Sequence, residues 1–150
     1  MQKQKIFALI PFVILFLLLF LSILAPYLEY KRIAISQDIY KIFRHICNQM
    51  PTHCFWIFGS NMALCARCFC IYLSLFITGI VLLLYPKFRN FKKKNSLGFV
   101  LSIPMVIDGL SQFWGMHESN NFYRAITGIL AGIGLGLIFF PAYWRLIKLK

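Results

Sequence analysis

Four long apolar segments dominate this chain of 150 residues. They cover residues 6–25, 69–85, 97–114 and 125–144. A helix rises about 1.5 Å per residue, so helices of these lengths match a hydrocarbon layer of roughly 30 Å. Lipid offers no hydrogen bonds to exposed backbone groups, so each spanning segment is expected to be helical. The sequence therefore predicts an all-α integral membrane bundle of four transmembrane helices, formed as a single domain over residues 1–150.

The composition supports a membrane location. Hydrophobic residues make up 60% of the chain and charged residues 13%, whereas soluble domains contain about 45–50% and 25%. The first apolar segment is longer than the core of a signal peptide, which runs about 7–15 residues. In addition, Pro26 directly follows the small residue Ala25. We therefore expect the first segment to be retained as a membrane anchor.

The net charge of +12 raises the question of nucleic-acid binding, because basic patches attract polyanions. The lysines and arginines instead collect at the ends of apolar segments, above all from Lys87 to Lys94 and after Trp144. Cytoplasmic flanks of membrane helices carry such charges. We therefore predict no nucleic-acid partner, a lipid bilayer as the main partner, and both termini of this multi-pass chain on the cytoplasmic side.

The stretch between the first two apolar segments has the pattern of a short amphipathic helix over residues 36–47. Ile39, Ile42, Phe43 and Ile46 recur at helical spacing, which predicts one apolar face. We expect this helix on the outer face, where it lies along the membrane or packs on the ends of the bundle.

Small residues mark one face of the last apolar segment, where Gly128, Gly132 and Gly136 recur every four residues. Such a stripe lets helix backbones approach closely in lipid, where no hydrophobic force drives helices together. We interpret it as packing within the bundle rather than as a dimer interface, since a four-helix chain has its own neighbours to satisfy. The oligomeric state stays open.

All five cysteines fall between residues 47 and 70. Cys65 and Cys68 form a Cys-x-x-Cys pair where the second apolar segment begins, and a helix would place them on one face. If the preceding loop brings Cys47 to the same place, three thiols converge at the membrane surface. Arg67 lies between the paired cysteines and favours a thiolate by its charge, which makes a better nucleophile or metal ligand.

Three kinds of chemistry fit this pattern, and the residues alone leave them open. The thiols can exchange disulfides and pass electrons to a membrane quinone. They can bind Zn²⁺ or another thiophilic metal, with His45, His53 or Asp108 as fourth ligand. They can also be buried small side chains or a structural disulfide. The quinone alternative resembles the bacterial disulfide-forming membrane proteins, which are likewise small helical bundles with an outward-facing Cys-x-x-Cys pair.

Asp108 is the acidic residue within the apolar segments. A carboxylate in hydrocarbon costs several kcal/mol without a partner, so Asp108 is expected to face the bundle interior with Arg67 or Arg124 as counter-ion. Gln112 lies four residues on and shares its helical face. An ionisable residue inside a membrane indicates a functional site. The alternative is a structural ion pair that holds two helices together.

These blocks together resemble the family called domain of unknown function 2085, which consists of small predicted bacterial membrane proteins. Its motifs are a Cys-His-Gln block, a Cys-x-Arg-Cys-x-Gly-x-Tyr segment that opens a helix, a Pro-x-x-x-Asp-Gly-x-x-Gln segment and a Ser-Asn-x-x-Arg-x-x-x-Gly segment. The resemblance covers residues 47–136, with matches at Cys47, Gln49, Cys65, Arg67, Cys68, Tyr72, Pro104, Asp108, Gly109, Gln112, Ser119, Asn120, Arg124 and Gly128. Asn48 and Cys70 depart from the pattern, which has histidine and glycine there. The resemblance implies a bacterial plasma (inner) membrane and supplies no established activity.

The bundle is expected to gather these side chains into a polar pocket in its outer half. The residues expected to act in catalysis are Cys65, Arg67, Cys68 and Asp108, those for ligand binding are Gln49, Gln112, Ser119, Asn120 and Arg124, and those for a metal are Cys47, Cys65, Cys68 and His53. The first hypothesis is thiol-based chemistry or a thiol-bound metal. The alternatives are a quinone-linked thiol-disulfide oxidoreductase, a site for an anionic lipid or small anion, and a structural subunit of a membrane complex.

Overall fold

The computed structural model describes residues 2–89, 93–115 and 119–147. Four long helices confirm the predicted all-α membrane bundle: α1 (Gln2–Tyr30), α3 (Ala66–Leu84), α5 (Lys94–Phe113) and α6 (Asn121–Leu146). Each of the four is long and apolar enough to cross a membrane. The shorter elements of the described chain are α2 (Ile35–Arg44), η1 (Pro51–His53), β1 (Cys54–Ile57), β2 (Ser60–Cys65) and α4 (Pro86–Arg89).

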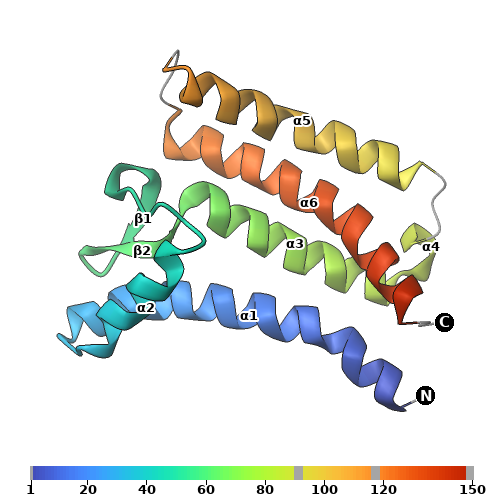
Figure 1. Cartoon of the computed structure of the whole chain (residues 1–150), viewed down its shortest axis with the longest axis horizontal. Helices are drawn as coiled ribbons and strands as arrows, with labels where there is room; N and C mark the ends of the chain where they lie inside the picture. The colour runs from blue at the N-terminus through green and yellow to red at the C-terminus, as the bar shows by residue number, and fades with distance from the viewer. Residues whose placement is uncertain (1, 90–92, 116–118, 148–150) are drawn as a thin grey trace.

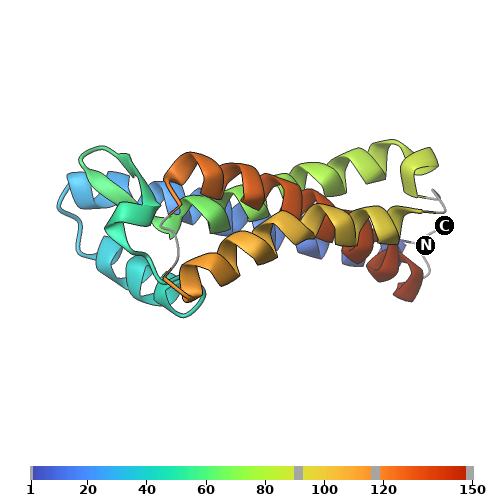
Figure 2. The same ribbon diagram turned by 90° about the horizontal axis from the view of Figure 1, so that it is seen from above.

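The long helices lie side by side, with α3 and α6 packed together in the middle (Figure 1). Helix α5 packs against α6 on one side, and α1 packs against α3 on the other. The small elements between α1 and α3 gather at one end of the bundle, whereas α1 begins and α6 ends at the opposite end (Figure 2). We call these the hairpin end, after the β1–β2 hairpin, and the terminal end.

Helix α1 continues beyond the boundary predicted at residue 25. Pro26 lies inside the helix, which runs on to Tyr30. Proline withholds one backbone donor, but protein neighbours compensate for this loss in membrane helices. Ala25 is fully buried here and packs with Phe43 of α2 and Leu64 of β2. The helix thus continues past the predicted apolar segment, and this added part packs against the hairpin end.

Helices α3, α5 and α6 also begin before the apolar spans predicted at residues 69, 97 and 125. The apolar pattern marks the part of a helix that faces lipid, whereas its first turn depends on a cap. Cys65 is the N-cap of α3. Asn120 is the N-cap of α6, and its Oδ1 atom accepts a hydrogen bond from the Tyr123 N–H over 3.0 Å.

Glycines bring the backbone of α6 against its neighbours. An added Cβ at Gly132 would overlap the Ser74 hydroxyl and the Ile71 carbonyl of α3. An added Cβ at Gly134 would overlap the carbonyl of Gly98 in α5. The small-residue face therefore packs inside the bundle, in agreement with the interpretation favoured from the sequence.

A two-stranded antiparallel hairpin, which the apolar pattern did not predict, links the loop after α2 to α3. Ile57 pairs with Ser60 across the two-residue turn Phe58-Gly59. Both turn residues have a positive φ, 54° and 79°, as a type I′ turn requires. The glycine between two apolar strands was the available signal for this turn.

Helix α2 is amphipathic as predicted, but its apolar residues divide between two surroundings. Ile39 and Phe43 are buried against the bundle, whereas Ile42, and Ile46 in the turn after the helix, are 66% and 46% exposed. One face of α2 therefore packs on the hairpin end, and an adjacent apolar edge points outward.

Replacing Gly132 by valine is expected to destabilise the bundle by about 1–3 kcal/mol, the usual cost of overpacking. The added side chain would meet the backbone of α3, which cannot move aside unless the whole helix shifts. Thermal unfolding in detergent, followed by circular dichroism, measures the change.

Gly109→Ala is the matched control, because an added Cβ at this helical position meets no atom within 4 Å. Alanine is a better helix former than glycine, so this variant should keep or raise the unfolding temperature. An equal loss of stability in both variants would contradict the close packing of α3 on α6.

Candidate functional site

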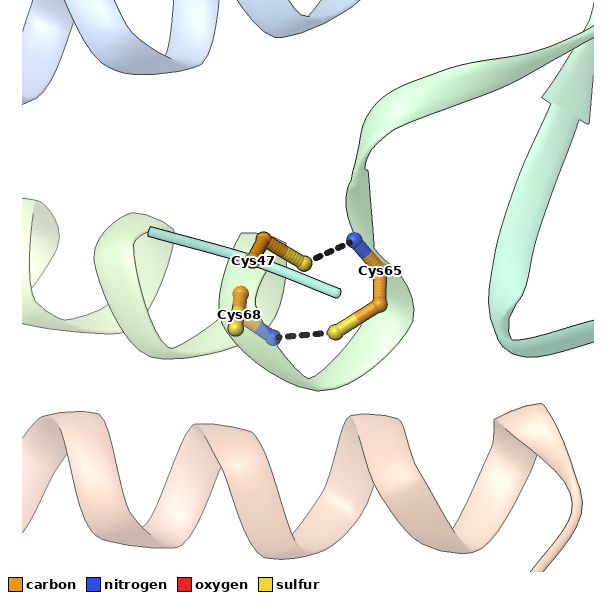
Figure 3. A group of neighbouring side chains, drawn as sticks. All are labelled: Cys47, Cys65 and Cys68. Atoms are coloured by element: carbon orange, nitrogen blue, oxygen red, sulfur yellow. Dashed lines mark hydrogen bonds between the residues drawn. The ribbon is translucent and has the colours of Figure 1, made fainter. Parts of the chain in front are cut away.

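Three cysteines from two distant segments meet at the hairpin end. Cys47 follows helix α2, whereas Cys65 and Cys68 lie at the start of α3. Their three Sγ atoms all lie within 4.8 Å of one another, and Figure 3 shows the side chains gathered around the first turn of α3. All three carry free thiols. We call this group the thiol cluster; the fold brings together the thiols that the sequence analysis expected to converge.

Gln49 ties the segment of Cys47 to the hairpin. Its side-chain amide donates hydrogen bonds to the carbonyl of Tyr40 in α2, 3.0 Å away, and to that of Ala63 in β2, 2.8 Å away. Gln49 is 8% exposed and has a positive φ of 52°, an uncommon conformation for a residue other than glycine. These bonds hold the loop where Cys47 reaches Cys65.

Backbone amides at the start of α3 point toward sulfur. The Cys68 N–H donates to the Cys65 Sγ atom over 3.5 Å, and the Cys65 N–H donates to the Cys47 Sγ atom over 3.2 Å (Figure 3). Amide donors and the positive end of the helix dipole both stabilise negative charge on sulfur. The fold itself therefore favours a thiolate in the cluster.

The pKa values of the clustered thiols Cys47 and Cys65 are shifted in opposite directions. Hydrogen bonds from the Cys65 and Cys68 thiols, together with backbone amides, hold the pKa of Cys47 well below its usual range. The hydrogen bond to Cys47 is the main cause that raises the pKa of Cys65. A thiolate on Cys47 is thus stabilised by protonated neighbours, which is a starting point for either metal binding or disulfide exchange.

A second group of polar side chains, here called the polar network, lies between α3, α5 and α6. Arg67 forms an ion pair with Asp108, and the two side chains are only 16% and 13% exposed. Gln112 donates to the Asp108 carbonyl over 3.1 Å and to the Ser119 Oγ atom over 2.8 Å. Arg124 donates to the Gln112 Oε1 atom over 2.7 Å and to the Ser119 carbonyl over 2.8 Å. These bonds join three long helices near the hairpin end.

The partner of Asp108 is Arg67, one of the two arginines considered from the sequence. Arg67 pairs with the carboxylate, whereas the guanidinium of Arg124, 4% exposed, also lies 3.0 Å from the Nε2 atom of His53. Because Asp108 balances the charge of Arg67, the support that Arg67 was expected to give the thiolates is reduced. The backbone amides described above supply that support instead.

Two of the three predicted fourth metal ligands contact arginines. Among the described residues, the atoms that could hold a metal within 4.8 Å of one another belong to the three clustered thiols. His53 faces Arg124, and Asp108 pairs with Arg67. His45 is exposed at the C-cap of α2. A fourth ligand from this set would require one of these arrangements to change.

The expected common pocket is divided into two parts. The thiol cluster packs toward α1 and α2, whereas the polar network faces α5 and α6. A cavity of about 470 Å³ beside the network is lined by Pro104, Ile107, Asp108, Ser111, Ser119, Tyr123 and Thr127. A cavity of about 450 Å³ at the hairpin end is lined by Glu29, Gln37, Tyr40, Lys41, Arg44, Gln49, Pro51 and Asn61. The clustered thiols line neither of these cavities, and Asn120 lies at the surface.

Sequence reasoning missed the position of Cys54. This residue pairs with Cys65 across the hairpin, and its carbonyl accepts a hydrogen bond from the Nδ2 atom of Asn121 over 3.2 Å. Burial is the main cause that raises the pKa of Cys54 to about 12. Without the strand pairing, no signal distinguishes Cys54 from Cys70, which lies on α3 and packs against Gly128 of α6.

Comparison with known proteins agrees with the sequence pattern. The family described as Predicted membrane protein (DUF2085) matches residues 47–138, a range that contains both the thiol cluster and the polar network. An uncharacterised protein of Methanocaldococcus jannaschii is 37% identical over 100% of this chain and 99% of its own length. An uncharacterised protein of Methanothermobacter thermautotrophicus is 38% identical over 64% of this chain and 86% of its own length. No solved structure matches.

Both of these relatives come from archaea. The expectation of a bacterial membrane is therefore not supported, whereas the membrane location itself agrees with the family description and with the four apolar helices. The family match covers more than half of the chain and begins at Cys47, the first of the clustered thiols. The chain therefore belongs to the DUF2085 family of predicted membrane proteins.

Proposed function

We propose that this membrane protein holds a thiophilic metal ion, with Zn²⁺ as the first candidate, at the thiol cluster of Cys47, Cys65 and Cys68. The observation that carries the proposal is the approach of the three Sγ atoms to within 4.8 Å of one another. Thiolates are the ligands that zinc and copper(I) accept readily. Zinc sites use three or four protein ligands, and a site with three leaves a position for water or substrate.

The spacing of the sulfur atoms suits a bound metal. Zinc–sulfur bonds of about 2.3 Å in a tetrahedron place sulfur atoms roughly 3.8 Å apart. Separations of up to 4.8 Å would close to this value by small side-chain rotations. The backbone N–H groups that donate to Cys47 and Cys65 would remain as outer contacts that orient the ligands.

Thiol-disulfide exchange is the second candidate function, and one observation favours it. Cys65 caps α3 and Cys68 lies in the first turn of the same helix, a setting that makes cysteines reactive. Oxidation of two thiols to a disulfide releases two electrons and two protons, which a membrane quinone would accept to become a quinol. The third thiol of the cluster has no required role in that reaction, so we place metal binding first.

The other site residues are proposed to position the cluster. Gln49 fixes the loop that carries Cys47. Arg67 and Asp108 connect the start of α3 to α5 through their ion pair. Gln112, Ser119 and Arg124 continue this connection to α6, and Asn120 caps that helix. Because Arg124 is buried and hydrogen-bonded to protein groups, these contacts give less support to the binding of an anionic lipid or small anion.

We further propose that the hairpin end lies outside the cell membrane and that both termini are cytoplasmic. Lys87, Arg89 and Lys93 lie in the connection between α3 and α5, at the terminal end, and Arg145 lies in the last turn of α6. Basic residues at helix ends favour the cytoplasmic side. The thiol cluster would then lie near the outer surface.

Protein purified in mild detergent without chelators is expected to contain about one metal ion per chain, because the cluster provides one set of ligands. Elemental analysis should find that Cys47→Ser, Cys65→Ser and Cys68→Ser each lose the metal. Cys70→Ser is the matched control, since Cys70 packs against Gly128 away from the cluster. If the purified protein contains no metal but reduces a quinone, and replacement of Cys65 or Cys68 abolishes this activity, the second candidate is supported and the first is contradicted.

A fluorescent protein fused after Lys150 is expected to fluoresce in cells, because it folds in the cytoplasm. The same protein would not become fluorescent if it were exported across the membrane in an unfolded state. An alkaline phosphatase fused at the same position should be inactive, since that enzyme needs an external location for its disulfides. Fluorescence and phosphatase activity of fusions after Lys150 therefore measure the orientation. An active phosphatase fusion together with a non-fluorescent fusion would contradict the proposed topology and indicate the opposite orientation.

A further inference from the structure

Cys54 lies directly opposite Cys65 in the antiparallel hairpin. Opposed residues of an antiparallel pair have Cβ atoms about 4.5–5.5 Å apart and present their side chains on one face of the sheet. The Cys65 sulfur belongs to the thiol cluster, so the Cys54 side chain lies on the same face as the cluster. Cys54 is 1% exposed, so its thiol lies inside the protein.

The ladder between the two strands is irregular here, because its register shifts between Cys54 and Trp56. Cys54 is therefore placed by its own pairing with Cys65, the last residue of β2, and not by the alternation of side chains along the strand.

Helix α6 holds the backbone of Cys54 in place. The Cys54 carbonyl accepts the hydrogen bond from Asn121, and the preceding residue, His53, contacts Arg124. With the backbone fixed, the position of the sulfur depends on χ1, which has three staggered positions. The Cys54 sulfur lies outside the 4.8 Å group, and a change of χ1 moves it relative to the cluster without any shift of the strand.

We propose that Cys54 is the fourth ligand of the metal site and closes it as a four-cysteine centre. This inference rests on the proposed function, because it assigns the coordination position that the three clustered thiols leave open. His53 and Asp108 contact arginines instead. Four thiolates around Zn²⁺ carry a net negative charge, and Arg124, whose guanidinium contacts the adjacent His53, is a cation close to Cys54 that would offset part of it.

The fourth ligand decides what the metal does. Zinc with four protein ligands is structural, whereas zinc with three keeps a position for water or substrate. A centre closed by Cys54 would clamp together the loop after α2, both strands of the hairpin and the first turn of α3. It would leave no metal-bound water for hydrolysis.

X-ray absorption at the zinc edge of the full-length, zinc-loaded protein tests the inference without any substitution. Four sulfur neighbours at about 2.3 Å are expected. Three sulfur atoms with one nitrogen or oxygen would overturn the role of Cys54 and leave the proposed function standing. Absence of bound zinc would overturn the proposed function, and this inference with it.

Cobalt(II) titration of Cys54→Ser provides a second test. The sulfur-to-cobalt charge-transfer absorption should fall to about three quarters of its value in the parent protein, and binding should weaken by roughly tenfold or more, since even outer contacts contribute that much. Cys70→Ser, the matched control, should match the parent protein. A Cys54→Ser variant with the absorption and affinity of the control would overturn the inference. If Cys54→Ser does not fold, the sulfur count at the zinc edge of the parent protein decides.

Discussion

The contact between α3 and α6 is the constraint on which the rest of the structure depends. Gly128, Gly132 and Gly136 present only hydrogen to α3, so backbone packing replaces the hydrophobic force that lipid does not supply. An added Cβ at Gly128 would lie 2.7 Å from the Arg67 carbonyl and 3.2 Å from the Cys70 Cβ atom. The glycine face therefore fixes the height of the first turn of α3 against α6. The thiol cluster and the polar network both begin at that turn.

Neighbouring residues in the first turn of α3 contact different parts of the protein. A helix turns by about 100° per residue, so Arg67 and Cys68 point in different directions. Cys65 and Cys68 pack toward α1 and α2, whereas Arg67 reaches Asp108 on α5. The ion pair therefore holds one side of the helix start while the sulfur atoms occupy the other. A shift of this single turn would disturb both groups, which couples the packing of α5 to the geometry of the thiols.

The number and type of the long helices could be predicted, because apolar length in a membrane protein leaves few other structures. The Cys65–Cys68 pair and the interior position of Asp108 followed from helical spacing and from the cost of a charge in lipid. The hairpin could not be predicted in the same way, because its register depends on a turn with positive φ at Phe58 and on contacts with α6. Cys54 gains its position only through that register. The division of the expected pocket also depends on side-chain directions around α3, which spacing alone does not give.

The length of α1 has a consequence for where the hairpin end lies. The candidate span Ile6–Tyr30 of α1 has 25 residues and is roughly 37 Å long, whereas the 19 residues of α3 are roughly 28 Å long and nearly match the hydrocarbon layer. The two helices pack together, so either α1 tilts in the bilayer or its last turns extend into the headgroup layer. Its last turns pack against the hairpin end through Ala25. Bilayer thickness would therefore change the depth of the thiols through α1. A thicker membrane would place them closer to the acyl chains, and a thinner membrane would place them closer to water.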